Sequence, residues 1–426
     1  MPPLGLLYIA SYLEKHGFSV KIIDPFSEGR EEYVSKSPYV GITCMSNQWV
    51  EVQEIARTIK ENDPDVTVVV GGVHPTVDTS SVIENLNVDI AVVGEGEKAV
   101  CRIVRDGIKQ GIVQGEANEN LDELPFPARH LINMEKYLSR DTVVPFNWLR
   151  GTTIITSRGC PFGCIFCLNS KKPMFGKTVH YHSPSYVEAE VEQLVSKYRV
   201  KGLYFYDDNF STWKERAMEI CKRISRFDLK WLCQSRGDAL DMQLLVALKD
   251  AGCSGISFGV ESGSPSVLSA LNKRLDLQKT VEAFEMCRQT GIKTLANIII
   301  GSPTETVEDI MLTDKLLEKI KPDYVDVWYL TAHRGTVLYD MASEQGWFRE
   351  DASFRVDEPQ VMINFSLHQL EEIRKGLLQK HRPFLRSLKP YLNGYFVYDM
   401  LRLLIRKPSL LLKGVDDWEN ASREAL

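Results

Sequence analysis

Three features are missing from this 426-residue sequence, and each absence excludes a class of protein. No run of 18 or more uncharged apolar residues occurs, so no membrane-spanning helix is predicted. The N-terminus lacks the basic segment of a signal peptide. Basic residues are not in excess, because 51 Lys and Arg stand against 57 Asp and Glu, a formal net charge of −6. This balance favours neither nucleic acid nor an anionic membrane as a partner, and a cytoplasmic location is expected.

Low-complexity tracts and short repeats are absent too, and the composition is that of a globular protein, with 44% hydrophobic and 25% charged residues. Nine cysteines are present. Six of them are scattered, and free cysteines of this kind are usually small buried hydrophobic residues. The other three are crowded into eight residues, which in a cytosolic enzyme indicates metal binding before disulfide bonding. The scattered six are Cys44, Cys101, Cys221, Cys233, Cys253 and Cys287.

Residues 1–115 alternate between helix and strand patterns. Short apolar strands joined by helices predict an α/β domain with a parallel, doubly wound (Rossmann-like) sheet, whose ligands bind at the carboxyl ends of the strands. Such a domain usually opens on a strand, whereas this chain opens on a predicted helix, so a leading strand is expected to be missing. The predicted helices cover 3–16, 49–61 and 98–109, and the predicted strands cover 20–24, 39–45, 66–71 and 90–94.

Residues 116–150 contain Leu124-Pro125-Phe126-Pro127 and predict a linker. Residues 151–335 follow with six strand–helix units, which predict a partial (β/α)6 barrel with its chemistry at the C-terminal ends of the strands. Residues 336–426 predict a helical C-terminal region, including helices at 369–379 and 398–405. The six predicted barrel strands cover 152–157, 202–206, 231–235, 255–260, 294–300 and 324–330.

The three crowded cysteines, Cys160, Cys164 and Cys167, directly follow the first predicted barrel strand with the spacing C-x3-C-x2-C. Three thiolates on one short loop can hold three corners of a cubane cluster, which leaves the fourth iron open to chemistry. Gly159 and Gly163 allow the backbone to wrap closely around such a cluster. The alternatives are a zinc site or a chance cluster. A structural zinc needs four ligands, and no fourth Cys or His lies nearby in the usual paired spacing.

This loop resembles that of the radical S-adenosylmethionine (SAM) superfamily, in which the same motif follows the first strand of a partial barrel. The resemblance covers about residues 150–335. It implies that Cys160, Cys164 and Cys167 hold a [4Fe–4S] cluster, and that SAM binds the open iron through its amino and carboxylate groups. Electron transfer from the cluster would then give a 5′-deoxyadenosyl radical. In such enzymes the cofactors perform the difficult chemistry and the protein positions them.

The resemblance also implies SAM-binding residues at the strand ends. Asp207 or Asp208 would receive the SAM amino group, and a helix N-cap is the alternative role of Asp208. Arg236 would meet the SAM carboxylate, with a surface ion pair as the alternative. Glu261 lies in a segment that resembles the family's GVES sequence and would face the same site, unless it forms a structural ion pair.

Two more strand ends belong to this prediction. Gly301 lies in a segment that resembles the family's G-x-P-x-E-T turn near adenine, although Asn297 stands where the family motif usually has glycine. His333 follows the sixth strand. It is expected to line the substrate space, and a solvated loop histidine is the alternative.

Segments upstream of the cysteines resemble the cobalamin-binding domain of one radical SAM class, which includes the class B methyltransferases. Cobalamin is large and flat and needs a sheet edge with small residues. The resemblance places Gly71, Gly72, His74 and Gly94 at that edge. The D-x-H-x-x-G motif of other cobalamin proteins is absent, so the cobalt is expected to have no protein ligand below it. His74 is a candidate ligand, but a turn histidine is the favoured interpretation. A doubly wound module without a cofactor is the alternative for the whole domain.

Together these resemblances imply methyl transfer to an unactivated carbon, in which one SAM methylates cobalamin and a second gives the radical that abstracts a substrate hydrogen. A small-molecule substrate is expected, with lipids and tetrapyrroles as candidates, and so is a reducing donor such as flavodoxin or ferredoxin. The alternatives are a radical SAM oxidative cyclase or another rearrangement enzyme without methyl transfer, and a non-catalytic cobalamin or iron–sulfur sensor. Methylthio transfer is disfavoured because the sequence has no second set of three N-terminal cysteines. Residues 401–412 are expected to pack in the core or to touch a membrane surface.

Overall fold

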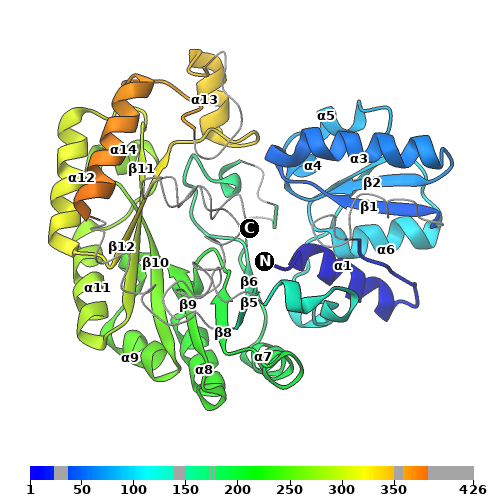
Figure 1. The fold of residues 1–426 in the computed structure, drawn as a ribbon, viewed down its shortest axis with the longest axis horizontal. Coiled ribbons are helices and arrows are strands. Elements are labelled where there is room, and N and C mark those ends of the chain that lie inside the picture. The colour runs from blue at the N-terminus through cyan, green and yellow to red at the C-terminus, as the bar shows by residue number, and fades with distance from the viewer. Residues whose placement is uncertain (24–36, 139–149, 172–173, 176–177, 350–357, 382–426) are drawn as a thin grey trace, which may run out of the picture. The chain divides into compact units, whose positions relative to one another are not determined.

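The computed structural model describes residues 1–23, 37–138, 150–171, 174–175, 178–349 and 358–381 (Figure 1). Two parallel β-sheets and the helices packed on them make up most of this part of the chain. Both sheets belong to one compact unit, Met1–His381.

The first sheet has four strands in the order β1-β2-β3-β4, and all neighbouring strands are parallel. Three of them confirm the predicted strands at 39–45, 66–71 and 90–94. The strands are β1 (Tyr39–Thr43), β2 (Thr67–Gly71), β3 (Ile90–Val93) and β4 (Gly111–Gln114). The helices are α1 (Leu4–Lys15), α3 (Trp49–Asn62), α4 (Val73–Val77), α5 (Thr79–Ile83) and α6 (Gly96–Asp106).

Both faces of the first sheet are covered, because successive residues of a strand point to opposite faces. Val68 of β2 packs with Val52 of α3 and Val82 of α5, whereas Val69 packs with Ile103 of α6. Figure 1 shows α3 and α6 on opposite sides of this sheet. Helices on both faces of a parallel sheet confirm the predicted α/β fold class. The strands follow one another in sequential order, so the four described strands contain no reversal of strand order.

Two features of this region differ from the sequence prediction. Residues 20–23 form no strand, because Ile22 packs against Leu4 and Leu7 of α1 in a separate apolar cluster. Asp24, the last residue of that predicted strand, lies outside the described residues. β4 is a strand that the apolar pattern does not reveal, since Val113 is the one buried residue among its four.

The second sheet has six parallel strands in the order β12-β11-β10-β9-β8-β5, which confirms all six predicted barrel strands. Among the described strands, β5 and β12 each have one neighbour, so the barrel is open and partial. The strands are β5 (Gly151–Ile154), β8 (Gly202–Phe205), β9 (Lys230–Ser235), β10 (Cys253–Glu261), β11 (Lys293–Ile300) and β12 (Tyr324–Tyr329). The intervening helices are α7 (Pro184–Tyr198), α8 (Lys214–Ile224), α9 (Met242–Asp250), α10 (Pro265–Ala270), α11 (Leu277–Thr290) and α12 (Val307–Ile320).

Aromatic side chains fill the core between the second sheet and its helices. The Phe258 ring of β10 lies 4.6 Å from the Phe284 ring of α11, measured between ring centroids. Trp231 of β9 is fully buried, and its indole N–H donates a hydrogen bond to the Ala251 carbonyl oxygen at 2.8 Å. These contacts fix the strands whose ends carry the predicted site.

The described C-terminal part consists of α13 (Val337–Gln345) and α14 (Leu367–His381), and α14 confirms the helix predicted at 369–379. Arg374 of α14 donates a hydrogen bond to the Val327 carbonyl oxygen of β12 at 2.9 Å, so this helix packs against the edge strand of the open barrel. The helix predicted at 398–405 and the segment 401–412 lie outside the described residues. None of the described helices combines the length and the apolar character that a membrane crossing requires.

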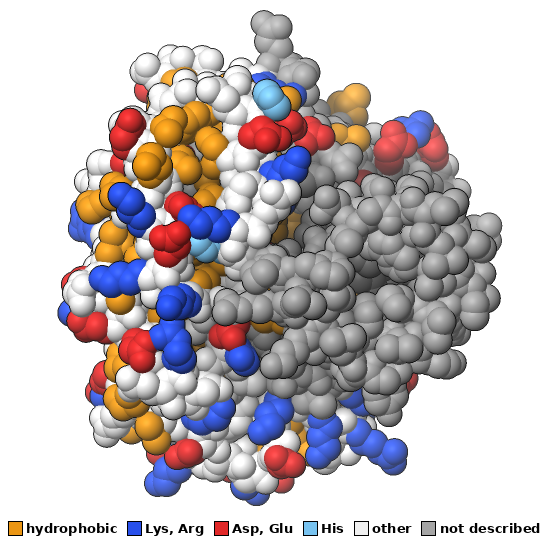
Figure 2. Space-filling model, turned by 60° about the vertical axis from the view of Figure 1, so that its left-hand side comes forward, with side chains coloured by type: hydrophobic (Ala, Val, Ile, Leu, Met, Phe, Trp, Pro, Cys, Tyr) orange, Lys and Arg blue, Asp and Glu red, His pale blue; other side chains and the backbone are white. Residues whose placement is uncertain are grey.

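Lysine and arginine side chains are interspersed with acidic side chains over the described face of Figure 2. On α12 and α14, for example, Lys380 forms ion pairs with Asp314 and Glu318 at 2.6 and 2.7 Å. This surface carries a mixed charge pattern, as the near balance of acidic and basic residues predicts.

Replacing Phe258 by alanine is expected to lower the free energy of unfolding by about 3–5 kcal/mol, since the change leaves a cavity against Phe284. Urea denaturation of the anaerobic protein measures the effect. Val246→Ala on α9 is the matched control, because Val246 is 45% exposed, and its effect should stay within about 0.5 kcal/mol. Equal effects of the two changes would show that Phe258 is not part of a close-packed core.

Candidate active site at the cysteine loop

The cysteine loop, residues 159–170, follows the carboxyl end of β5 in the second sheet. A short strand, β6 (Ser157–Arg158), pairs antiparallel with β7 (His180–Tyr181) before the loop begins. Gly159 follows with φ +93°, and a Cβ atom there would lie 3.2 Å from the Thr178 carbonyl oxygen. Glycine is therefore required at the point where the chain turns toward the first cysteine.

The three cysteines are free thiols, with Cys164 buried and Cys160 and Cys167 half-buried. Burial raises the pKa of Cys160 and Cys164, and it raises the pKa of Cys167 to about 11. Electrostatic repulsion from neighbouring cysteines of the loop raises the pKa of Cys160 and Cys167 further. Within the described part of the chain, no three His, Cys, Asp or Glu side chains converge on one point as for a single ion. A cubane binds its thiolates at separate iron atoms, so this donor set fits three corners of a [4Fe–4S] cluster.

Contacts from two distant segments hold the cysteine loop. Asn272 donates a hydrogen bond from Nδ2 to the Gly163 carbonyl oxygen at 2.6 Å. Ile165 donates its backbone N–H to the Leu271 carbonyl oxygen, and its own carbonyl oxygen accepts the N–H of Leu338, both at 3.0 Å. The loop is thus fixed between the turn after α10 and the start of α13.

The two predicted aspartates have different surroundings. Asp207 is buried, and its carboxylate accepts hydrogen bonds from the Thr156 and Ser157 N–H groups at 2.6 and 2.9 Å and from the Thr156 hydroxyl at 2.5 Å. Asp208 is exposed and accepts a hydrogen bond from Asn169 of the cysteine loop at 3.4 Å. Asp208 therefore lies beside the thiols, while Asp207 holds the backbone that leads to them.

Glu261 forms a buried ion pair with Lys273, with 2.7 Å between Oε1 and Nζ. Burial alone would lower the pKa of Lys273, but Glu261 and Cys164 outweigh it and hold the pKa above its usual value. The hydrogen bonds of Asn272 and Leu271 to the residues on either side of Cys164 bring this turn, and with it the ion pair, close to Cys164. Sequence reasoning missed Lys273, because a lysine between Asn272 and Arg274 has the pattern of an exposed polar turn. The positive φ angles of those two neighbours, +51° and +47°, turn it inward.

Arg236 packs its guanidinium group on the Phe162 ring of the cysteine loop, 3.9 Å from the ring centroid. It also pairs with Asp238 at 2.7 Å and donates hydrogen bonds to the carbonyl oxygens of Lys273 and Arg274 at 3.0 and 2.9 Å. In this arrangement Arg236 connects the Lys273 turn with the cysteine loop.

Gly301 directly follows β11 and has φ +83°, and its N–H donates a hydrogen bond to Glu305 Oε2 at 2.6 Å. Burial raises the pKa of Glu305 to about 7. Glu305 Oε1 and the Ser302 hydroxyl are buried and have no hydrogen-bond partner among the described residues. These two groups suit the polar edge of a bound nucleoside. His333, after β12, is half-buried, and burial lowers its pKa.

The predicted cobalamin edge lies at the carboxyl ends of β2 and β3. Gly72 has φ +106°, and a Cβ atom there would lie 3.0 Å from the Cys44 carbonyl oxygen. The Gly94 N–H donates a hydrogen bond to the Thr76 hydroxyl at 3.0 Å, and that hydroxyl donates to the Gly72 carbonyl oxygen at 2.8 Å. Together with Gly71, this edge has small residues where a flat macrocycle must approach, which fits cobalamin.

His74 is buried at this edge, and both of its ring nitrogens have hydroxyl partners. Nδ1 lies 3.3 Å from the Ser46 hydroxyl oxygen and Nε2 lies 3.1 Å from that of Ser81. The ring also packs beside Trp49, with 4.9 Å between centroids. These contacts favour the turn histidine over the cobalt ligand.

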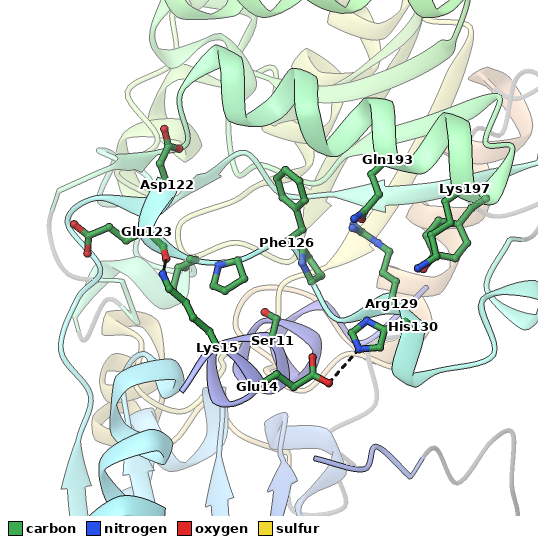
Figure 3. A pocket seen from close by; sticks show the side chains of 14 residues that line it. Ser11, Glu14, Lys15, Asp122, Glu123, Phe126, Arg129, His130, Gln193 and Lys197 are labelled. Carbon is green, nitrogen blue, oxygen red and sulfur yellow. Dashed lines mark hydrogen bonds and ion pairs between the residues drawn. The ribbon is translucent and has the colours of Figure 1, made fainter. Parts of the chain in front are cut away.

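A separate pocket of about 530 Å³ lies between α1, the segment 122–130 and α7 (Figure 3). Figure 3 shows Glu14 and His130 paired across its lower side. The pocket contains none of the three cysteines and none of the residues predicted to bind SAM or cobalamin. The candidate site is therefore defined by the cysteine loop and the strand ends rather than by this cavity.

Comparison with known proteins agrees with this geometry. The family model of the radical SAM superfamily matches residues 154–317, and that of the B12 binding domain matches residues 1–104. An uncharacterized methyltransferase of Pyrococcus horikoshii is 33% identical over 370 residues, which cover 80% of this chain and 78% of that protein. The chain belongs to the cobalamin-binding class of the radical SAM superfamily.

Two further proteins are similar to this chain at lower identity. Cytidylyl-2-hydroxyethylphosphonate methyltransferase of Streptomyces wedmorensis is 26% identical, over 90% of this chain and 86% of that protein. The solved structure of the cobalamin-dependent radical enzyme OxsB, with aqua-cobalamin and SAM bound, superposes with a TM-score of 0.70 at 14% identity. That comparison covers 95% of this chain and 72% of OxsB, and it shows a shared fold. The cofactors of this radical SAM chain are thus a [4Fe–4S] cluster, SAM and cobalamin.

Cys160→Ala is expected to abolish cluster binding, since two thiolates cannot hold the cubane in place. Iron and sulfide per chain after anaerobic reconstitution, together with visible absorption, measure the loss. Cys101→Ala is the matched control, because Cys101 is a buried cysteine of α6 outside the loop, and this variant should bind wild-type amounts of iron. A Cys160→Ala protein with a full complement of iron would exclude this loop as the ligand set.

Glu305→Gln is expected to change the pH dependence of stability. With a folded pKa of about 7 against a usual value near 4.5, Glu305 favours the folded state fully below about pH 4.5, and this contribution is lost as the pH rises through about 7. Between about pH 4 and pH 8, the wild type should therefore lose about 3 kcal/mol of unfolding free energy that the variant retains. Urea denaturation at both pH values measures it. Glu308→Gln, at an exposed position of α12, serves as control, and identical slopes in all three proteins would contradict the prediction.

Proposed function

We propose that the chain is a cobalamin-dependent radical SAM methyltransferase that methylates an unactivated carbon of a small molecule. The observation that carries the proposal is the cysteine loop at the carboxyl end of the first barrel strand, in a chain that also has a B12 binding domain. The 33% identity to a protein named as a methyltransferase, over most of both chains, supports methyl transfer.

When bound, the cluster and SAM supply the radical, and cobalamin supplies the methyl group. The residues of this chain hold and orient these groups. Cys160, Cys164 and Cys167 bind the cluster. Next to Cys164, the Glu261–Lys273 pair offers one buried negative and one buried positive charge, which complement the amino and carboxylate groups of SAM.

The remaining predicted residues have supporting roles in this proposal. Asp208 lies beside the thiols and can receive the SAM amino group, whereas Asp207 and Arg236 position the cysteine loop. Gly301 and its neighbours form the nucleoside edge. The predicted cobalamin edge, called the corrin edge from here on, consists of Gly71, Gly72, His74 and Gly94. His74 packs within this edge and does not bind cobalt in this proposal.

The substrate lies, in this proposal, near His333 at the end of β12. Lipids and tetrapyrroles are the classes to screen first. A flavodoxin or a ferredoxin would reduce the cluster, and the cytoplasm is the proposed location.

Anaerobic reconstitution with iron, sulfide and hydroxocobalamin, followed by SAM and a reductant, is expected to yield 5′-deoxyadenosine. Lys273→Met should lower its rate of formation by about 10- to 100-fold, as for the loss of one charged hydrogen bond, while the iron content stays at the wild-type value. Lys279→Met, at an exposed position of α11, is the control. Mass spectrometry of substrates from the screen then separates the outcomes. A methylated product supports methyl transfer, a dehydrogenated one indicates a cyclase, and a cluster without SAM cleavage indicates a sensor.

A further inference from the structure

Arg158 lies between two buried carboxylates, those of Glu95 and Glu97, which follow β3 of the first sheet. Its Nη1 is 2.5 Å from Glu95 Oε2, and its Nη2 is 2.6 Å from Glu97 Oε1. All three side chains are at most 7% exposed. Asn118 adds a hydrogen bond from Nδ2 to Glu95 Oε2 at 2.7 Å. One guanidinium fork thus holds two carboxylates from a segment far away in the sequence.

Arg158 lies in the middle of a continuous path of contacts and covalent bonds between the predicted cobalamin edge and Cys160. Glu95 directly follows Gly94, whose N–H is hydrogen-bonded to Thr76, and Thr76 is hydrogen-bonded to the Gly72 carbonyl oxygen. In the other direction, Arg158 is followed by Gly159, which packs against the Thr178 carbonyl oxygen, and then by Cys160. The contacts run without interruption from the corrin edge to the first cluster ligand.

Little freedom remains at the cluster end of this chain. Ser157, which precedes Arg158, donates its N–H to the buried Asp207 carboxylate at 2.9 Å. The guanidinium group also lies over the Tyr8 ring of α1, 5.2 Å from the centroid. A movement of the Ser157–Arg158 segment, from which the cysteine loop starts, must therefore move the Glu95 and Glu97 carboxylates or break two buried charged hydrogen bonds.

We propose that Arg158, with Glu95 and Glu97, is a positioning residue that couples cobalamin binding at the Gly72–Gly94 edge to assembly of the cluster. The inference rests on the proposed function for its two ligand sites. Binding of the cluster fixes the direction of Cys160, and through Arg158 it orders the corrin edge. Coupling of this kind is reciprocal, so cobalamin equally favours the ordered cysteine loop.

The test is the affinity of the full chain for hydroxocobalamin, measured by anaerobic equilibrium dialysis and cobalt analysis, with and without a reconstituted cluster. In the wild type, the cluster should tighten binding at least about fivefold. In Arg158→Lys this ratio should fall to within about twofold of unity, because an ammonium group cannot hold both carboxylates in a fork.

Two further variants make the result specific. Glu97→Gln keeps the shape of the site but removes one charge, and it should reduce the ratio even if Arg158→Lys folds poorly. Arg334→Gln is the matched control. Arg334 also links the barrel to the first sheet's helices, through Asp78 at 3.1 Å, but it is 44% exposed and does not precede the cysteines. This control should keep the wild-type ratio, and circular dichroism and iron content verify folding and loading for each variant.

Each result supports or overturns the inference. A wild-type ratio of one, an unchanged ratio in both Arg158→Lys and Glu97→Gln, or an equal loss in Arg334→Gln would each overturn it. A wild type that binds no hydroxocobalamin at all would overturn the proposed function as well. Tight binding of hydroxocobalamin with the same affinity in the presence and absence of the cluster would overturn the coupling alone and would not affect the methyltransferase proposal.

Discussion

The cluster site depends on the buried carboxylate of Asp207, which binds the backbone leading to the cysteines rather than a cofactor. Asp207 lies two residues beyond the end of β8, the strand next to β5, and its two oxygens accept three hydrogen bonds from Thr156 and Ser157. A carboxylate with several short charged hydrogen bonds is a rigid anchor, especially where little water competes. Because the cysteine loop begins two residues beyond Ser157, this anchor fixes the point from which the loop starts.

The remainder of the barrel acts on the same loop from the other side. Arg236 packs on Phe162, and Asn272 binds the Gly163 carbonyl oxygen. The parallel arrangement makes this possible, since the carboxyl ends of neighbouring strands meet at one edge of a sheet. Residues far apart in the chain thereby surround one short loop, and the Glu261–Lys273 pair places one charge of each sign beside it.

The sequence was most informative where local pattern and structure coincide. The barrel strands have a buried face that the apolar pattern reveals, as in β11, where every second residue is buried, and the cysteine spacing reflects a loop that carries its own ligands. Pattern reasoning failed where a role depends on a distant partner. Glu95 and Glu97 bind Arg158, 63 and 61 residues away, and no local pattern indicates this pairing. Lys273 has a polar neighbourhood in sequence and a buried partner in space. Residues 20–23 have strand propensity, but Ile22 packs on α1 instead.

The contact between the cysteine loop and α13 has a consequence for the order of events during synthesis. Ser170 accepts the backbone N–H of Val337, which lies 167 residues further along the chain. A ribosome that adds about 5–20 residues per second needs on the order of ten seconds to reach that residue. For that interval the nascent loop lacks the backbone contacts that α13 supplies in the folded chain.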